Sequence, residues 1–333
     1  MIFQRRPSTR SVCILAVASA GLMTAACSNG GQMEAAVGEG EDWSTNKATM
    51  IVAASPGGGS DLMARTVAQG IEEIDENITI TVENHPGGST AVGYSHLLSK
   101  TGNPEFLVGA ETTLSALPLA IDTAYRWDDF TPIAQIAEDA LIVAVLANSD
   151  YESLDDLAET AREGEKLRAG IVAAVGPDSV LLDLLSKDQG VEYEPVVFEA
   201  ADESNAALLA GNIDFLINNP GESKAYVESE DMRFLATFTE ERLEDEMFTD
   251  LPTAIEQGVD VEFAQWRGVL AAGDIPEESA AYWQEQISAW TEQDSYTEYI
   301  TKNDLVPILR TGSEFEDYLT EYEGVLSESI SKD

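Results

Sequence analysis

The sequence predicts an α/β fold with two lobes, and two observations carry this prediction. Short apolar runs rich in β-branched residues recur from residue 50 onward, and segments with a helical spacing of apolar residues lie between them. The chain also has 333 residues, 44% of them hydrophobic, which is enough for two lobes with cores of their own.

The expected strands are short and almost continuously apolar, which is typical of strands covered on both faces in a mainly parallel sheet. Between the first two strands, Met63, Val67 and Ile71 keep helical spacing, and aromatic residues keep it in the segments 283–290 and 315–326. The expected strands are residues 50–54, 78–82, 106–109, 141–147, 168–172, 194–198, 213–217 and 234–238.

Residues 1–26 are typical of an export signal. Arginines but no acidic residues precede an apolar run at residues 12–23, and small residues then lead into Cys27. Small residues before a cysteine resemble the lipobox of bacterial lipoproteins, although Thr24 stands where that motif usually has Leu. Cys27 is therefore expected to carry lipid and to anchor the exported protein to a membrane. The alternative is an ordinary signal peptide in which Cys27 is incidental.

Residues 27–46 contain many Gly, Ser and Glu residues and are expected to form a flexible tether. The formal net charge of the chain is −43. Removal of residues 1–26, with Arg5, Arg6 and Arg10, leaves 18 − 3 = 15 basic against 61 acidic side chains, or −46. Such a surface repels phosphate backbones, so the composition argues against a nucleic-acid partner.

Glycine-rich loops follow three of the expected strands. Residues 55–61 (SPGGGSD) and 83–90 (ENHPGGST) each lead from a strand into a helix, and Gly176 to Ser179 do the same after residues 168–172. Glycine lets several backbone N–H groups converge, Ser60 or Asp61 can cap the first helix, and the free N–H groups of a helix start favour an anion. The alternative is that these glycines serve turn geometry alone.

Several motifs typical of enzymes and of metal sites are absent from this sequence. It has no nucleotide P-loop, no G-x-G-x-x-G and no G-x-S-x-G, and its two histidines, His85 and His96, lack the spacing of metal ligands. We therefore expect no metal, no cofactor and no enzyme activity. The competing hypothesis from another class is a secreted hydrolase that uses a serine such as Ser179.

Six segments resemble signature elements of the tripartite tricarboxylate transporter receptors, the TctC or Bug family. They occur in the order typical of that family and cover residues 48–268, which is far more specific than one glycine loop. The segments are 56–65 (PGGGSDLMAR), 82–88 (VENHPGG) with Gly93 beyond, 129–134 (DFTPIA), 209–214 (LAGNID), 251–254 (LPTA) with Gly258, and 266–268 (WRG).

The resemblance implies a type II periplasmic-binding-protein fold with two α/β lobes joined by a hinge. Lobe 1 would comprise residues 47–137 and 254–333, and lobe 2 residues 138–253. The resemblance implies a ligand carboxylate held in the cleft by residues of both lobes. These residues are Ser55, Gly57, Gly58, Gly59, Ser60, Asp61, Gly87, Gly88, Ser89, Thr90, Glu111, Thr112, Gly176, Ser179, Asn218 and Asn219.

The function predicted from this resemblance is capture of a mono-, di- or tricarboxylate by a monomeric receptor. The receptor would deliver its ligand to the large and small membrane subunits of a tripartite transporter. Ser55, and the pair Ser89 and Thr90, stand where many relatives carry other residues, which leaves the identity of the ligand open. Two roles are open for Arg267 of the WRG segment: a cation in the ligand cleft, or a member of a structural ion pair. The alternative to transport is signalling, in which the protein acts as a ligand-binding adaptor for a sensor kinase.

Overall fold

The computed structural model describes residues 43–172, 174–243, 245 and 247–330. The expected export signal (residues 1–26), Cys27 and all of the expected tether except residues 43–46 lie outside the described residues. Residues Asp42–Asp333 form one compact unit. No helix of the described part is long and apolar enough to cross a membrane.

The first sheet has six strands in the order β11-β4-β10-β3-β1-β2. Strands β1, β2 and β3 are parallel, whereas β10 is antiparallel to β3 and β4, and β11 is antiparallel to β4. The strands are β1 (Lys47–Val52), β2 (Thr79–Asn84), β3 (Phe106–Glu111), β4 (Thr131–Asp139), β10 (Gln265–Ala271) and β11 (Val306–Thr311).

Helices cover both faces of this sheet. Met50 and Val52 of β1 pack against the helices of one face, and Ile51, which points the other way, packs against those of the opposite face. The first face carries α1 (Gly59–Ile74), α8 (Glu277–Thr291) and α9 (Asp294–Lys302), and the second carries α2 (Ala91–Leu98), α3 (Thr113–Ala120) and α10 (Ser313–Ser329).

The second sheet has five strands in the order β7-β6-β8-β5-β9, with α4 and α5 on one face and α6 and α7 on the other. Its strands are β5 (Ile142–Leu146), β6 (Arg168–Ile171), β7 (Glu194–Val197), β8 (Phe215–Asn218) and β9 (Met232–Thr237). Its helices are α4 (Leu154–Arg162), α5 (Pro177–Gln189), α6 (Ala201–Leu209) and α7 (Pro220–Glu228). The 3₁₀ helices η1 (Trp127–Asp129) and η2 (Ile255–Gln257) lie in connecting segments.

All eight predicted strands are present, and most strands of each sheet run in one direction, as predicted. Both sheets are nevertheless mixed, because β10 and β11 run opposite to the other strands of the first sheet, and β5 runs opposite to the other strands of the second. Strands β4, β10 and β11 were not predicted. Polar residues such as Gln135, Glu138 and Arg310 interrupt their apolar runs.

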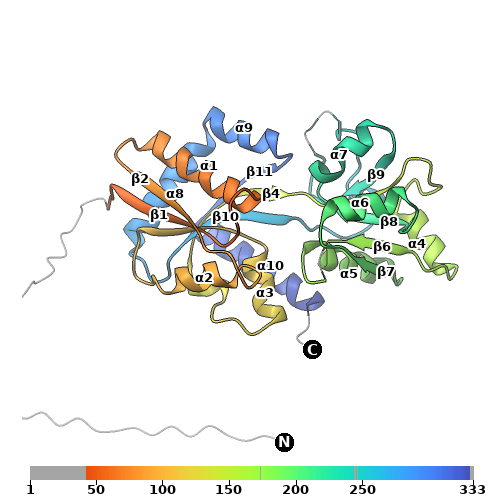
Figure 1. Cartoon of the computed structure of the whole chain (residues 1–333), viewed down its shortest axis with the longest axis horizontal. Coiled ribbons are helices and arrows are strands. Elements are labelled where there is room, and N and C mark those ends of the chain that lie inside the picture. Colours follow the sequence, from red (N-terminus) through yellow and green to blue (C-terminus); the bar gives the residue numbers. More distant parts are fainter. Residues whose placement is uncertain (1–42, 173, 244, 246, 331–333) are drawn as a thin grey trace, which may run out of the picture. The chain divides into compact units, whose positions relative to one another are not determined.

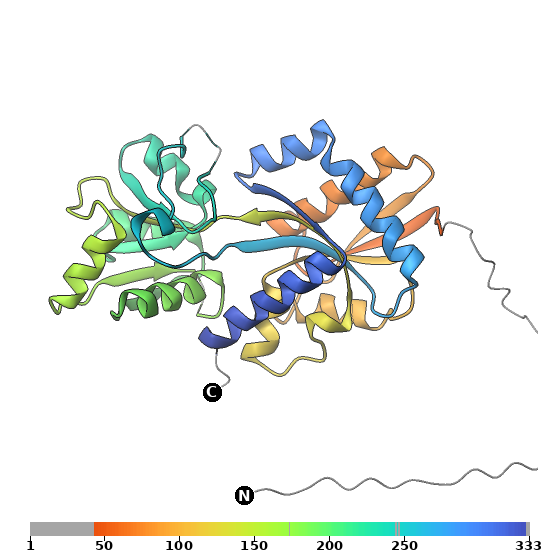
Figure 2. The same ribbon diagram turned by 180° about the vertical axis from the view of Figure 1, so that it is seen from behind.

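Two connections join the sheets. Strand β4 ends at Asp139 and β5 begins at Ile142, so the chain passes from one sheet to the other almost without a loop. The return runs from the end of β9 to the start of β10, and both views show β4 and β10 extending between the two sheets (Figures 1 and 2). The lobe boundaries at 137/138 and 253/254 stay a prediction.

Candidate functional site

The carboxyl ends of β1, β2 and β3 lie at one edge of the first sheet. Val52 near the end of β1 is the register partner of Asn84 in β2 and of Gly109 in β3. The loops that follow these strands therefore emerge side by side. Because open α/β sheets bind ligands at this edge, the loops 53–58 and 85–90 lie where a ligand site is expected.

The antiparallel strands bring further polar residues to the same edge. Arg267, near the start of β10, is the register partner of Glu111 at the end of β3. Gln265 in β10 is in turn the partner of Asp139, the last residue of β4. The site edge of the first sheet therefore also carries a cation and two carboxylates.

The second sheet presents its carboxyl edge at the same place. Ile142, the first residue of β5, is the register partner of Asn218 at the end of β8 and of Thr237 at the end of β9. Since Ile142 follows Asp139 so closely, the carboxyl edges of the two sheets meet at this crossing. Asn219 closes the junction, because its side-chain amide donates to Oδ1 of Asp139 and to the Ala140 carbonyl, both at 2.8 Å.

Arg267 and Asp139 form a buried ion pair at the crossing. The Arg267 side chain is 17% exposed and the Asp139 side chain 9%, and Nε donates to Oδ2 at 3.2 Å. Burial raises the pKa of Asp139, while the Arg267 guanidinium and the Asn219 amide act to lower it. Of the two roles left open for Arg267, the structural ion pair is thus present.

Arg267 also reaches the first glycine loop, so the ion pair does not remove it from the site edge. A methyl group on Gly59 would lie 3.4 Å from Nη1 of Arg267. The neighbouring Ser60 hydroxyl donates to Glu111 at 3.1 Å. The start of α1 therefore combines helix N–H groups with a nearby guanidinium, which is an arrangement that attracts an anion.

Asp61 holds the first glycine loop in shape. Its carboxylate accepts hydrogen bonds from the Gly57 N–H at 2.9 Å and from the Asn84 amide at 2.8 Å, and it pairs with Arg65 at 3.0 Å. Asp61 is 4% exposed, so its side chain supports the loop from within, which corrects its inclusion among the ligand-binding residues. Gly58 stands at the helix cap with no side-chain cap bond, so the expected capping by Ser60 or Asp61 is also wrong.

The environment of Asp61 makes stability depend on acid pH. Hydrogen bonds from Arg65, opposed by burial and supported by the Gly57 and Asn84 donors, lower its pKa to about 2. A carboxylate with a depressed folded-state pKa stabilises the fold above its unfolded pKa, and this stabilisation is lost as pH falls through the folded value. We expect Asp61→Asn to lower the free energy of unfolding by on the order of 2 kcal/mol at pH 7.

Urea denaturation from pH 7 to pH 2 checks this prediction. The difference between the wild type and Asp61→Asn should shrink between about pH 4 and pH 2. Asp155→Asn is the matched control, because Asp155 pairs with Arg162 at the surface and its side chain is 66% exposed. The control should cost less than about 1 kcal/mol. An equal cost for both variants, or a pH-independent difference, would contradict the role given to Asp61.

The second glycine loop folds over the start of its own helix. The carbonyls of Gly87 and Gly88 accept the N–H groups of Val92 and Ala91 at 3.2 and 3.1 Å. The expectation that these first N–H groups of α2 are free for a ligand is therefore wrong. Ser89 and Thr90 have φ values of +50° and +82°, a region that non-glycine residues rarely adopt.

Buried hydroxyl groups that the sequence analysis missed follow this loop and β3. They come from Thr113 and Ser115 in the first turn of α3 and from Tyr125, and the predicted Thr90 belongs with them. The Thr90 and Tyr125 hydroxyls interact with each other, and Thr113 interacts with the Tyr94 hydroxyl. The Ser115 hydroxyl has no hydrogen-bond partner within the described residues. Burial raises the pKa of Tyr125 to about 12, so it stays a neutral donor. The hydroxyl-rich run at residues 112–115 was the signal available in the sequence.

Two other predicted residues have structural partners instead. The Thr112 hydroxyl lies 2.9 Å from the hydroxyl of Tyr322 in α10, and Thr112 is 1% exposed. Asn218 is 2% exposed, and its amide donates to Ser223 at 3.2 Å. Both stand at the predicted edge, but their side chains contribute to the interior, which corrects the expectation that they face a ligand.

Side chains from the first turn of α5 form hydrogen bonds with backbone groups at and before the start of this helix. The Gly176 N–H donates to the Ser179 hydroxyl at 3.0 Å, and that hydroxyl donates to the Gly176 carbonyl at 2.8 Å. Asp178 accepts from the Val172 N–H at 2.6 Å. A nucleophilic serine needs a nearby base, but His85 and His96 stack on each other beside β2 and α2, so Ser179 has no histidine base among the described residues.

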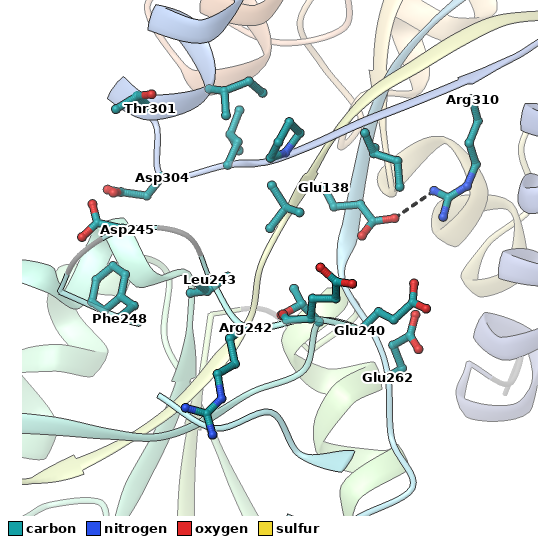
Figure 3. A pocket seen from close by; sticks show the side chains of 17 residues that line it. Glu138, Glu240, Arg242, Leu243, Asp245, Phe248, Glu262, Thr301, Asp304 and Arg310 are labelled. Carbon is teal, nitrogen blue, oxygen red and sulfur yellow. Dashed lines mark hydrogen bonds and ion pairs between the residues drawn. The ribbon is translucent and has the colours of Figure 1, made fainter. Parts of the chain in front are cut away.

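A cavity of about 380 Å³ lies elsewhere, against Glu138, α9 and β11, and contains none of the predicted site residues. Figure 3 shows the carboxylates of Glu138, Glu240 and Glu262 together there, with Arg310 paired to Glu138 at 3.0 Å. Burial and the neighbouring Glu240 and Glu138 raise the pKa of Glu262. This excess of carboxylates disfavours an anionic ligand, so the cavity does not compete with the site edge.

The family model described as "Tripartite tricarboxylate transporter family receptor" matches residues 63–322. The chain belongs to this family. Among curated relatives, the chain is 23% identical over 302 residues to protein BugT of Bordetella pertussis, and the match covers 85% of this chain and 89% of BugT. It is 22% identical over 245 residues to a UPF0065 protein of Agrobacterium vitis, covering 71% of this chain and 68% of that protein.

Solved structures show the same fold as this TctC-family chain. A TctC solute-binding protein from Polaromonas has a TM-score of 0.78 at 21% identity, covering 85% of this chain and 97% of its own. R. palustris Rpa4515 with adipate has a TM-score of 0.67 at 25% identity, covering 86% and 96%. MatC from Rhodopseudomonas palustris with bound malate has 0.67 at 19% identity, covering 86% and 99%. The predicted periplasmic-binding-protein fold is thus confirmed.

Proposed function

We propose that this receptor binds a small mono-, di- or tricarboxylate between the carboxyl edges of its two sheets. The observation that carries the proposal is the meeting of these edges at Asp139 and Ile142, beside the first glycine loop and Arg267. Backbone N–H groups and a guanidinium are the donors that carboxylates accept most strongly. The ligand-binding residues proposed from the sequence are retained for Ser55, Gly57, Gly58, Gly59, Ser60, Gly87, Gly88, Ser89, Thr90, Glu111, Gly176, Ser179 and Asn219.

The first lobe supplies most of the attraction, so the carboxylate docks there first. The site edge of the second lobe, with Asn219 and the start of α5, then closes over it by a hinge motion at the short β4–β5 connection. Closure excludes water and strengthens each charge-assisted hydrogen bond. The net charge of −46 that remains without residues 1–26 repels the anion at long range, but salt screens this repulsion beyond about 8 Å.

The ligand class is supported by two relatives of the same fold, because the structure of one is described with adipate and that of the other with bound malate. Both ligands are dicarboxylates. The buried hydroxyls of Thr90, Thr113 and Tyr125 supply additional polar contacts for a second carboxylate or a hydroxyl group. The same proposal places the protein outside the cytoplasm as a monomer, anchored by lipid at Cys27, with the large and small membrane subunits as its partners.

A thermal-shift screen over mono-, di- and tricarboxylates tests the function. A ligand at 100 times its dissociation constant stabilises the native state by about 2.7 kcal/mol, which corresponds to a rise in melting temperature of roughly 5 °C. Native mass spectrometry should then recover the bound ligand unchanged. No shift with any carboxylate would contradict ligand capture, and release of an alcohol or amine from ester or amide probes would support the hydrolase hypothesis.

A further inference from the structure

The fold brings together the two histidines of the chain, whose spacing along the sequence does not indicate a pair. His85 follows β2 directly, and His96 lies in α2. Their rings stack at a centroid distance of 4.1 Å with 15° between the planes. Glu83 of β2 joins them, and one ligand atom from each of these three side chains lies within 4.8 Å of the other two.

The separation of the Glu83 and His85 ligand atoms is compatible with coordination of one ion, provided that the stacked imidazole rings turn so that a nitrogen of each faces it. Nε2 of His85 lies 3.4 Å from Oε2 of Glu83, which is longer than the usual range of about 2.7–3.2 Å for a hydrogen bond to oxygen. Tetrahedral ligands that each lie about 2.0–2.2 Å from a zinc ion stand roughly 3.3–3.5 Å apart. The observed separation therefore matches two ligands of one ion.

The cluster is accessible to solvent, and the backbone of His85 is held in place by a hydrogen bond. The His85 side chain is 27% exposed and the Glu83 side chain 48%, so an ion can reach them. The backbone N–H of His85 donates to the Val52 carbonyl at 2.8 Å, which holds this residue against the end of β1. Two imidazoles and one carboxylate form a recognised set for zinc, with water at the remaining position.

We propose that Glu83, His85 and His96 form a binding site for a divalent transition-metal ion, with Zn²⁺ as the preferred probe. Imidazole nitrogen selects such ions over Mg²⁺ and Ca²⁺, which prefer the oxygen ligands that abound on this acidic chain. A bound ion links the end of β2 to α2 across the loop 86–90. The spacing of the histidines predicted no metal site, and this proposal departs from that prediction because the turn between strand and helix brings the two rings into contact.

The test uses the full chain produced without a histidine tag, in 150 mM salt with excess Mg²⁺ to occupy the acidic surface. Because the chain has two histidines, its imidazole ring signals in NMR spectra are few and can be followed individually. Titration with Zn²⁺ should shift the signals of both rings together and saturate at one equivalent. Unchanged signals, or a shift of one ring alone, would overturn the proposal without any variant.

Variants provide the second arm. His85→Gln, His96→Gln and Glu83→Gln should each weaken Zn²⁺ binding, measured by calorimetry, by about tenfold or more. Glu159→Gln is the matched control, because it removes the same charge from an exposed position in α4 and should bind Zn²⁺ as the wild type does. Wild-type affinity in both histidine variants would show that the ion binds the acidic surface instead, and would refute the site.

Discussion

Replacing Arg267 with methionine is expected to lower the free energy of unfolding by about 3–5 kcal/mol. The substitution removes the cation that faces Asp139, whose side chain is 9% exposed, and leaves a carboxylate buried without its partner. An unpaired buried charge costs far more than the intact pair contributes. Urea denaturation of the ligand-free protein at pH 7 measures the loss.

A double-mutant cycle with Asp139→Asn provides the control. The asparagine still accepts the amide of Asn219 but carries no charge, so the Arg267→Met/Asp139→Asn variant should be more stable than Arg267→Met alone. A loss below about 1 kcal/mol for Arg267→Met would contradict the buried pair. Strict additivity of the two substitutions would contradict it as well, since residues in contact are expected to couple.

Replacing Ser60 with aspartate is expected to weaken binding of a carboxylate ligand by about 100-fold or more, which is about 2.8 kcal/mol. Ser60 lies in the first turn of α1, beside Gly59 and within 3.1 Å of the Glu111 carboxylate. A carboxylate in the first turn competes with the ligand for the helix N–H groups and repels it directly. Calorimetry with the strongest ligand of the thermal-shift screen gives the ratio.

Ser60→Asn is the matched control, because asparagine has the same size as aspartate and no charge. It should retain affinity within about tenfold of the wild type, the cost of a lost neutral hydrogen bond. Acidic residues are compatible with the first turn of a helix, so Ser60→Asp should remain folded. Equal affinities for the aspartate and asparagine variants would show that the ligand carboxylate does not approach this helix end.

The sequence predicted the fold well because its signals are local. Each of the eight predicted strands is a short apolar run, and the glycine loops at residues 55–59 and 85–90 follow β1 and β2 as expected. Strands β4 and β10 escaped prediction because polar residues interrupt their hydrophobic patterns, Gln135 in β4 and Arg267 of the site edge in β10. One of the residues that obscured these strands thus belongs to the candidate site.

The candidate site was harder to predict because side-chain partners come from distant parts of the chain. The spacing of Asp61 suggested a helix cap, yet its carboxylate turns back to Gly57 and Asn84. Asp139 was not singled out, since nothing local marks it as the partner of Arg267. The strand and helix that carry His85 and His96 had to be placed side by side before their contact could be seen.

A crystal structure of the protein with the carboxylate that gives the largest thermal shift tests the central claim most directly. The account predicts a ligand carboxylate within about 2.7–3.2 Å of backbone N–H groups in the loop 57–60, between the carboxyl edges of the two sheets. A ligand seated in the acidic cavity beside Glu138 and Arg310, or outside the junction of the two sheets, would contradict it.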